Sequence, residues 1–190
     1  MDIRAQRTLK MLVDAFEELC CEKSLEEITV TELCNLSTVR RATFYRHFGD
    51  MRDFTKYYFA TMTERLIARL SGLHDLDRLM PYAEAMHREL LEYVAENRML
   101  ARHAMGPGML ADTMDMIVVQ IADGIVLRIH SEQDAGTVDV SISAEAVGLF
   151  YSAGIAHSMR WWLLDDKPAP IGEIVDSGMA VLRRMLGMRD

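Results

Sequence analysis

Three arginines, a threonine, a tyrosine and a histidine fall within eight residues of this sequence: Arg40, Arg41, Thr43, Tyr45, Arg46 and His47. Guanidinium, hydroxyl and imidazole groups are the donors with which proteins contact phosphate oxygens and base edges. At helical spacing the intervening apolar side chains point inward and leave this polar set together outside. Those apolar residues are Val39, Ala42, Phe44 and Phe48. A solvated basic face is the plainer interpretation, but the apolar spacing favours a short packed helix that binds a polyanion.

The charge of the chain is unevenly distributed. The 190 residues carry a formal net charge of −8, with 21 basic and 29 acidic side chains. Between Thr38 and Lys56 there are five basic residues and two acidic ones, whereas the 134 residues after Lys56 hold twelve basic and nineteen acidic ones. An acidic total does not exclude a nucleic-acid partner, because binding depends on where the basic residues lie. A basic helix on an otherwise acidic protein is typical of an element that enters a DNA groove.

Apolar residues recur at helical spacing along the whole chain, and the sequence predicts an all-α fold. The expected helices are Asp2–Glu22, one that opens at Thr29, about Arg40–His47, Asp50–Leu70, Arg78–Glu96, Arg98–Met105, Ala111–His130, Ser143–Leu164 and Ile171–Leu186. Thr29 and Glu32 have the spacing of a capping box, and Asp50 is the expected cap of the long helix. Gly106-Pro107-Gly108 is the strongest break, and Glu132–Ser141 reads as a polar loop.

The stretch from Thr29 to Phe48 resembles the N-terminal helix-turn-helix signature of the TetR family of transcriptional regulators. The matching residues, in order, are Thr29, Glu32, Leu33, Val39, Arg41, Thr43, Phe44, Tyr45, Arg46, His47 and Phe48. The resemblance covers roughly residues 4–54, and the chain length and helical pattern agree with the family over the rest. It implies a three-helix DNA-binding domain over residues 1–50 and a helical domain over 51–190 that binds an effector and dimerises.

By this resemblance the Arg40–His47 helix enters the major groove of a double-stranded DNA operator. Arg40, Arg41 and Thr43 would then be nearest the bases, and Arg4 and Arg7 would reach the backbone or minor groove. The complete set of expected DNA contacts is Thr29, Arg40, Arg41, Thr43, Tyr45, Arg46, His47, Arg52, Lys56, Arg4 and Arg7.

Three positions depart from the family pattern. Thr38 stands where the family often has glycine in the turn, so either the turn differs or a left-handed threonine is strained. Arg40 stands at the cap position where serine is common, and Met51 replaces a common lysine. Arg52 or Lys56 would substitute for the phosphate contact of that lysine.

Methionine is abundant, with 15 in the chain and most of them after Lys56. Plain core filling is the favoured interpretation, and a malleable apolar cavity for an apolar or amphipathic small-molecule effector is the functional one. The candidate pocket residues are Tyr82, Met86, Leu90, His103, Met109, Met114, Ile117 and Trp161. His87 and His103 are possible polar anchors, although either could be an ordinary structural histidine.

The last two helices predict a homodimer. Small residues alternate with large apolar ones between Ala144 and Leu164, and the final helix has an apolar stripe. The expected interface residues are Phe150, Gly154, Ile155, Met159, Ile174, Met179 and Leu182. These helices could instead bury themselves within one protomer, but a four-helix bundle made from two copies matches a palindromic operator. The run from Tyr151 to Leu163 also resembles the C-terminal domain of one TetR subgroup.

The function expected from this pattern is a repressor that a small-molecule effector releases from its operator. An enzyme is disfavoured, since the sequence has no phosphate-binding loop, nucleophile elbow or metal-ligand spacing, and no cofactor is expected. A DNA-binding dimer controlled by a partner protein, or by nothing, is the remaining alternative. The first residues lack an apolar signal core and no stretch would span a bilayer, which predicts a cytoplasmic protein without a membrane partner. Cys20 and Cys34 fall at core-like positions with Cys21 beside them, and buried structural thiols are the expected interpretation, with a redox switch as the minor alternative.

Overall fold

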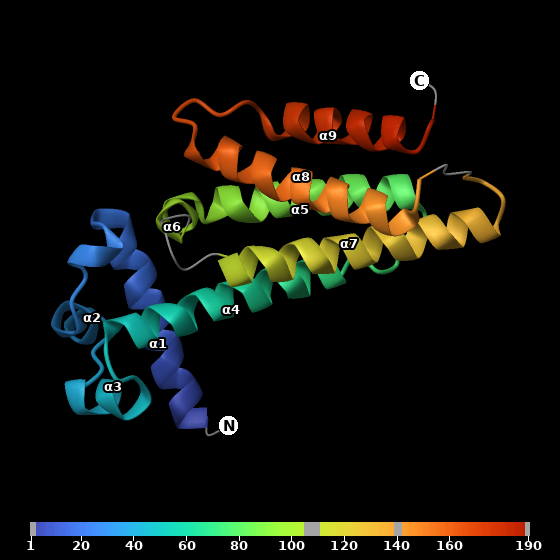
Figure 1. Cartoon of the computed structure of the whole chain (residues 1–190). Helices are drawn as coiled ribbons and strands as arrows, with labels where there is room; N and C mark the ends of the chain where they lie inside the picture. Colours follow the sequence, from blue (N-terminus) through green and yellow to red (C-terminus); the bar gives the residue numbers. More distant parts are fainter. Residues whose placement is uncertain (1–2, 105–110, 139–141, 189–190) are drawn as a thin grey trace. The chain divides into compact units, whose positions relative to one another are not determined.

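The structure is a computed structural model, and it describes residues 3–104, 111–138 and 142–188. These residues form α-helices and one short 3-10 turn, and none of them forms a strand (Figure 1). The helices are α1 (Ile3–Glu22), α2 (Val30–Leu36), α3 (Arg41–His47), α4 (Met51–Ser71), α5 (Leu79–Glu96), α6 (Arg98–Ala104), α7 (Ala111–Asp134), α8 (Ala144–Leu164) and α9 (Ile171–Met185), with the turn η1 (Leu25–Glu27) between α1 and α2. The predicted all-α fold class is therefore confirmed.

The chain divides into two compact units. The first comprises Met1–Met62 and Met99–Gly106, and the second comprises Thr63–Arg98 and Pro107–Asp190. The division falls within α4, so this helix contributes its first half to one unit and its second half to the other.

Aromatic rings form the core of the first unit. Phe16 of α1 contacts Phe54 and Tyr58 of α4, with ring centroids 5.2 and 4.9 Å apart. Phe44 of α3 and Phe48 after it also contact Phe54, at 6.0 and 5.2 Å. All five side chains are buried. Edge-to-face contacts of this kind add to the free energy of apolar burial, so the cluster fixes α3 against α1 and α4.

In the second unit α7 and α8 form the most extensive helix pair, and small residues permit their close approach. A Cβ added at Gly148 would lie 2.6 Å from Val126 Cγ2 and 3.1 Å from the Ala122 carbonyl oxygen. Gly148 therefore serves packing between α7 and α8 within the protomer.

A buried arginine ties the α4–α5 connection to α7. The Arg128 guanidinium donates to the carbonyl oxygens of Leu76 (2.6 Å), Gly124 (2.9 Å) and His74 (3.3 Å). Its Cζ also lies 3.4 Å from the centroid of the Tyr82 ring. A buried cation needs such partners, and carbonyl dipoles with an aromatic face supply them here.

Most predicted helix boundaries agree with the structure to within one residue. The predicted polar loop at Glu132–Ser141 is wrong at its start, because α7 continues to Asp134. The carboxylate of Glu132 accepts a hydrogen bond from the Leu79 N–H at 2.9 Å and lies 3.6 Å from Arg78. This polar residue of α7 therefore binds the first residues of α5 instead of belonging to a loop. Gly106-Pro107-Gly108 lies outside the described residues. No helix among the described residues is both long and apolar enough to cross a membrane.

Candidate nucleic-acid interface

Helix α3 is held by its apolar side and presents its cations outward. Phe44 is fully buried, and Val39 and Phe48 before and after the helix are also buried. Arg40, immediately before the helix, has extended backbone and its carbonyl oxygen accepts from the N–H groups of the first turn. Ala42, expected to pack inward, is exposed, because the aromatic cluster takes up only the Phe44 side of this short helix.

The outer face of α3 carries the predicted DNA-contacting side chains. Arg40, Arg41 and Arg46 are exposed, and within the described part of the chain none of them forms an ion pair with a carboxylate. Tyr45 is 48% exposed, and the Arg41 guanidinium lies over its ring at 5.9 Å from the centroid. An unpaired, exposed guanidinium keeps all its donors available for a phosphate or a guanine edge.

Thr43 and His47 lie partly behind this face. Both are half-buried, and His47 Nε2 is a buried atom with no hydrogen-bond partner among the described residues. A donor or acceptor left unsatisfied in this way carries an energetic cost, which a phosphate oxygen or an ordered water would remove.

The turn before α3 contains Thr38 in the left-handed backbone conformation, which was one of the two alternatives that the sequence left open. Thr38 has φ of +56°, and among the described residues it is the one non-glycine residue with positive φ. Its backbone N–H donates to the Asn35 carbonyl at 3.3 Å, and the side chain is exposed. The turn therefore has the geometry that suits glycine, with a β-branched residue in its place.

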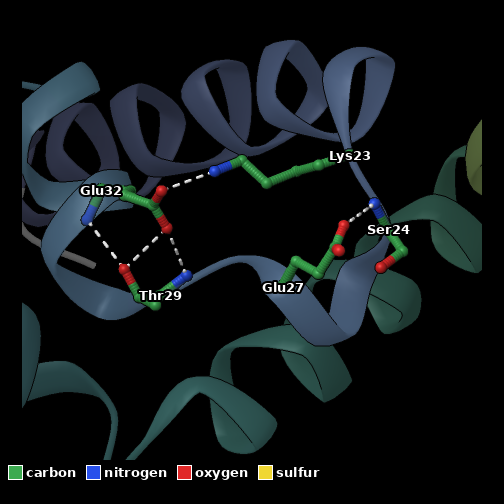
Figure 2. Close-up of polar contacts among 5 residues, drawn as sticks. All are labelled: Lys23, Ser24, Glu27, Thr29 and Glu32. Atoms are coloured by element: carbon green, nitrogen blue, oxygen red, sulfur yellow. Dashed lines mark hydrogen bonds and ion pairs between the residues drawn. The ribbon is translucent and has the colours of Figure 1, made fainter.

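The N-terminus of α2 has the predicted capping box, shown in Figure 2. The Glu32 N–H donates to Thr29 Oγ1 (3.2 Å), while Thr29 N–H (3.0 Å) and its hydroxyl (2.7 Å) donate to Glu32 Oε2. Lys23 at the end of α1 donates to the other carboxylate oxygen at 2.5 Å. These hydrogen bonds, that of Lys23 foremost, lower the pKa of Glu32 to about 2. The Thr29 hydroxyl already donates its proton to Glu32. A phosphate that accepted a hydrogen bond from this hydroxyl would therefore have to displace the Glu32 carboxylate.

The other predicted contacts lie on neighbouring helices of the same unit. Arg52 and Lys56 are exposed, four residues apart, on the first turns of α4, and Arg4 and Arg7 are exposed at the start of α1. The carboxylates nearest to Arg52 and Lys56 in the sequence, Asp50 and Asp53, accept backbone hydrogen bonds at the start of α4. Asp50 Oδ1 accepts from the Asp53 N–H at 2.9 Å, and Asp53 accepts from the Gly49 N–H at 3.2 Å. Asp50 is thus the cap of α4, as predicted.

Burial of Cys20 and Cys34 agrees with the structural interpretation of these two thiols, whereas Cys21 does not share it. Cys20 and Cys34 are buried and Cys21 is exposed. Burial raises the pKa of Cys20 to about 12, with the neighbouring Cys21 and Glu17 adding to the effect, and burial also raises the pKa of Cys34. A thiol with a raised pKa is a poor nucleophile, which disfavours a redox switch at these two positions.

The predicted pocket residues do not all lie together. Tyr82, Met86, Leu90 and Ile117 are buried in the packing of α5 and α7, whereas Trp161 is 60% exposed on α8. Met109 lies outside the described residues, and so do the side chains of His103 and Met114.

The predicted dimer residues divide between two faces. Ile155, Met159, Met179 and Leu182 are buried within the protomer, because α8 and α9 pack on α5 and α7. Phe150 (72% exposed) and Gly154 lie on the outer face of α8, and Ile174 of α9 is half-buried. Of the predicted interface residues, therefore, Phe150 and Gly154 are exposed on α8, the helix on which Trp161 is also exposed.

A groove of about 440 Å³ lies between α8 and α9, and its lining includes four residues of the predicted dimer interface, namely Phe150, Gly154, Ile155 and Ile174. Phe150, Ile155 and Trp161 line it from α8, and His87 of α5 lies at its wall. The sequence suggested His87 only as a possible polar anchor for an effector. Its position beside α9 depends on tertiary packing, which the apolar periodicity of the sequence does not encode.

Comparison with known proteins gives the fold and no closer relationship. No protein-family model matches the sequence, and no curated protein sequence is significantly similar to it. A TetR-family transcriptional regulator of Pectobacterium atrosepticum has a similar structure, with a TM-score of 0.70, 17% identity, and coverage of 98% of this chain and 95% of that one. A bacterial regulatory protein in the TetR family from Rhodococcus RHA1 gives a TM-score of 0.65 at 16% identity over 100% of both chains.

A third similar structure is the transcriptional regulator FadR of Bacillus subtilis in complex with stearoyl-CoA. Its TM-score is 0.71 at 11% identity, covering 93% of this chain and 98% of that one. These similarities extend through both units, well beyond the helix-turn-helix segment. The chain has the all-helical fold of the TetR-family transcriptional regulators.

Proposed function

We propose that this protein is a cytoplasmic DNA-binding transcriptional regulator, a repressor that binds a palindromic operator as a homodimer and is released by a small-molecule effector. The observation that carries the proposal is the outer face of α3, where Arg40, Arg41 and Arg46 are exposed and unpaired among the described residues. This face belongs to a chain with the fold of TetR-family regulators. Three exposed cations without carboxylate partners on one short element are available to pair with the phosphates of a polyanion.

In this proposal α3 is the recognition helix. Arg40 and Arg41, at its N-terminal end, read base edges together with Thr43, and Arg46 and Tyr45 contact the backbone. The ring of Tyr45 holds the Arg41 guanidinium in position by a cation–π contact at 5.9 Å. Thr29, His47, Arg52, Lys56, Arg4 and Arg7 complete the predicted set as phosphate or minor-groove contacts.

The proposed dimer uses one exposed stripe on each of the last two helices. On α8 the exposed residues recur at alternating intervals of four and three: Phe150, Gly154, His157, Trp161 and Leu164. On α9 the half-buried Ile174 is followed at similar intervals by Ser177, Val181 and Arg184, all exposed. This is the spacing with which helices of a bundle meet, and nothing lies within 4 Å of a Cβ added at Gly154, which leaves room for a partner helix.

The proposed effector is an apolar or amphipathic molecule bound by the helices of the second unit. The similar fold of Bacillus subtilis FadR, solved with stearoyl-CoA, supports an effector of this class. Because α4 contributes to both units, an effector that prefers one arrangement of the second unit would change the spacing of the two recognition helices.

The proposal is tested by selecting bound duplexes from a random DNA pool and measuring affinity for the enriched sequence. We expect a palindrome, a steep loss of affinity with rising salt, and a loss of about 1–3 kcal/mol of binding free energy for Arg41→Ala. Tyr45→Ala should lose less, because its direct contact is with the backbone. Lys167→Ala is the matched control, since it removes an exposed cation from the second unit. Failure to enrich any sequence, or an equal effect of the control, would contradict the proposal.

A further inference from the structure

An arginine in the second half of α4 is bound by one face of α5. Arg69 Nε donates to Glu89, and the two terminal nitrogens of Arg69 donate to Glu96 at 2.6 and 3.4 Å. The Arg69 Cζ also lies 5.3 Å from the centroid of the Tyr93 ring. Glu89, Tyr93 and Glu96 follow one another at intervals of four and three residues, so they share one face of α5. One guanidinium therefore joins α4 to successive turns of α5, and this set of four residues is called the Arg69 clamp below.

The ion pairs of the Arg69 clamp are partly exposed to solvent. Arg69 and Glu89 are half-buried, and Glu96 is exposed. The hydrogen bond between Arg69 and Glu96 raises the pKa of the arginine and lowers the pKa of the carboxyl group. Because water screens ion pairs of this kind, the clamp favours one arrangement of the helices without locking it. An effector that changes affinity by the usual factor of about 5 to 150 can outweigh a contact of this strength.

Helix α4 does not belong to the most closely packed helix pairs of the second unit. Among the described residues of this unit those pairs are α7/α8, α5/α9, α5/α7, α8/α9 and α5/α8. The second half of α4 buries Leu66 and Leu70. After the last residue of α4, the Arg128 guanidinium binds the carbonyl oxygens of Leu76 and His74 at 2.6 and 3.3 Å. Polar contacts along α4 and beyond its end therefore contribute much of what holds this helix in the second unit.

Of these polar contacts, the Arg69 clamp opens at the lower cost. Arg128 is buried, so moving its guanidinium would leave carbonyl oxygens without a donor. The groups of the Arg69 clamp lie at the surface, where water replaces each hydrogen bond that is lost. Because α4 is continuous from Met51 to Ser71, a change in its direction within the second unit is carried into the first unit.

We propose that Arg69 is a positioning residue of this regulator, which holds α4 through Glu89 and Glu96 in the arrangement that binds the operator. The effector of the proposed function acts by favouring an arrangement in which the Arg69 clamp is open. The inference rests on the proposed function for its consequence at DNA, whereas the clamp itself is a property of the protomer. Arg69 touches neither DNA nor the effector in this proposal and acts only through α4.

The arrangement of the two units is measured as the distance between two spin labels in one full-length protomer. The labels are attached to Glu18→Cys on α1 and Lys167→Cys after α8, both at exposed positions, in a Cys21→Ser background that removes the exposed native thiol. Labelled chains are diluted with unlabelled ones, so that distances between protomers do not contribute. The chain with Arg69 should give one narrow distance distribution, and Arg69→Met should broaden it or add a second distance.

Three further variants separate positioning from a general loss of structure. Arg69→Lys keeps the cation but loses the fork that binds Glu96 through two nitrogens, so it should restore part of the narrow distribution. Glu96→Gln changes an exposed carboxylate, should keep the fold, and should broaden the distribution less than Arg69→Met. Arg88→Met is the matched control, because Arg88 pairs with Glu84 one turn away on α5 and this ion pair joins no two helices. It should leave the distribution unchanged.

Operator affinity is the second readout. When the clamp is open, only a fraction of the molecules has the arrangement that binds, and the apparent dissociation constant rises in inverse proportion to that fraction. Arg69→Met should therefore weaken binding to the selected duplex about tenfold. The salt dependence of binding should stay unchanged, because no phosphate contact is lost. Arg88→Met, which removes a cation from the same unit, should bind like the wild type.

The proposal is wrong if Arg69→Met leaves the distance distribution unchanged, or if this variant binds the selected duplex as tightly as the wild type or more tightly. It is also wrong if Arg88→Met has the same effect as Arg69→Met. Failure to select any operator would contradict the proposed function, and the distances would still decide whether Arg69 fixes α4.

Discussion

At the scale of single residues, Thr38 in the turn between α2 and α3 has a side chain that disfavours the backbone conformation it adopts. Thr38 has φ of +56°. In this region the Cβ crowds the following carbonyl oxygen, at a cost of roughly 1–2 kcal/mol for an L-residue. The exposed threonine side chain offers no packing in return. The turn is therefore kept by the helices on either side of it, since α2 packs on α1 and α3 packs in the aromatic core.

Replacing Thr38 by glycine should stabilise the protein. Glycine removes the crowding but loses more backbone entropy on folding, so we expect a net gain of about 0.5–1 kcal/mol in the free energy of unfolding. Chemical denaturation measures it. Thr38→Ala is the control, because it retains a Cβ and should gain clearly less. Equal stability of the glycine and alanine variants would show that the Cβ is not the source of strain.

Glu32 should make the first unit sensitive to acid. Its hydrogen bonds to Lys23 and Thr29 lower its pKa to about 2, whereas the unfolded chain has a value near 4.5. A lowered pKa means that the folded state binds fewer protons, so the contribution is complete above pH 4.5 and is lost as the pH falls toward 2. Glu32→Gln should therefore lose less stability than the wild type between pH 4.5 and 2.

The comparison is made from denaturation midpoints at several pH values. Glu26→Gln, an exposed carboxylate in the adjacent turn, controls for the general effect of removing an acidic charge. If Glu32→Gln and the wild type lose stability in parallel across this interval, the capping box does not contribute to acid sensitivity.

At the scale of elements, α3 has an N-terminus adapted to binding rather than to stability. Arg40 occupies the cap position with extended backbone and makes no side-chain capping hydrogen bond. A serine there would satisfy one of the free N–H groups, whereas an arginine places a cation beside the positive end of the helix. Such an arrangement is unfavourable for the isolated helix and favourable near a polyanion.

Arg40→Ser should consequently change stability and DNA affinity in opposite directions. The new cap should raise the free energy of unfolding by about 0.5–1 kcal/mol, while the lost cation weakens binding to the selected duplex and lowers the salt dependence. Arg40→Ala separates the two effects, since it removes the cation without adding a cap. A serine variant that binds DNA as tightly as the wild type would exclude Arg40 from the interface.

At the scale of the whole molecule, the acidic excess and most of the large exposed apolar side chains belong to the residues after Lys56. Residues after Lys56 carry nineteen acidic and twelve basic side chains, whereas the segment from Thr38 to Lys56 has a basic excess. A negative second unit would oppose non-specific adhesion to DNA and leave α3 to make the contact. The exposed stripe on α8 interrupts this acidic surface and marks the proposed dimer face.

Introducing a charge into that stripe should separate the protomers. Phe150→Glu is expected to raise the dimer dissociation constant at least about a hundredfold, because burying an unpaired carboxylate at an interface is unfavourable. Sedimentation at several concentrations measures it. Leu127→Glu is the matched control, since Leu127 is a similarly exposed apolar residue on α7. If Leu127→Glu alone weakened the dimer, the interface would lie on α7 and not on α8.

The sequence by itself determined the local features of this protein. The Thr29 capping box, the Asp50 cap and the helical face that buries Phe44 each depend on residues a few positions apart, where spacing and side-chain chemistry are sufficient. It also located the cations of α3 on an outer face, because a helix with one apolar side has only one way to pack. For Thr38 the sequence left two alternatives, a different turn or a strained left-handed threonine, and only the backbone with its φ of +56° decided between them.

Only the tertiary structure decided how the last helices divide their apolar surface. Apolar residues surround α8, so periodicity cannot say that Ile155 and Met159 face the protomer core while Phe150 and Trp161 face outward. The same holds for Gly148, which packs on α7, and for Gly178, which packs on His87. These contacts join residues far apart in sequence, and their energy depends on which helices become neighbours. The groove between α8 and α9 therefore exists only in the folded chain.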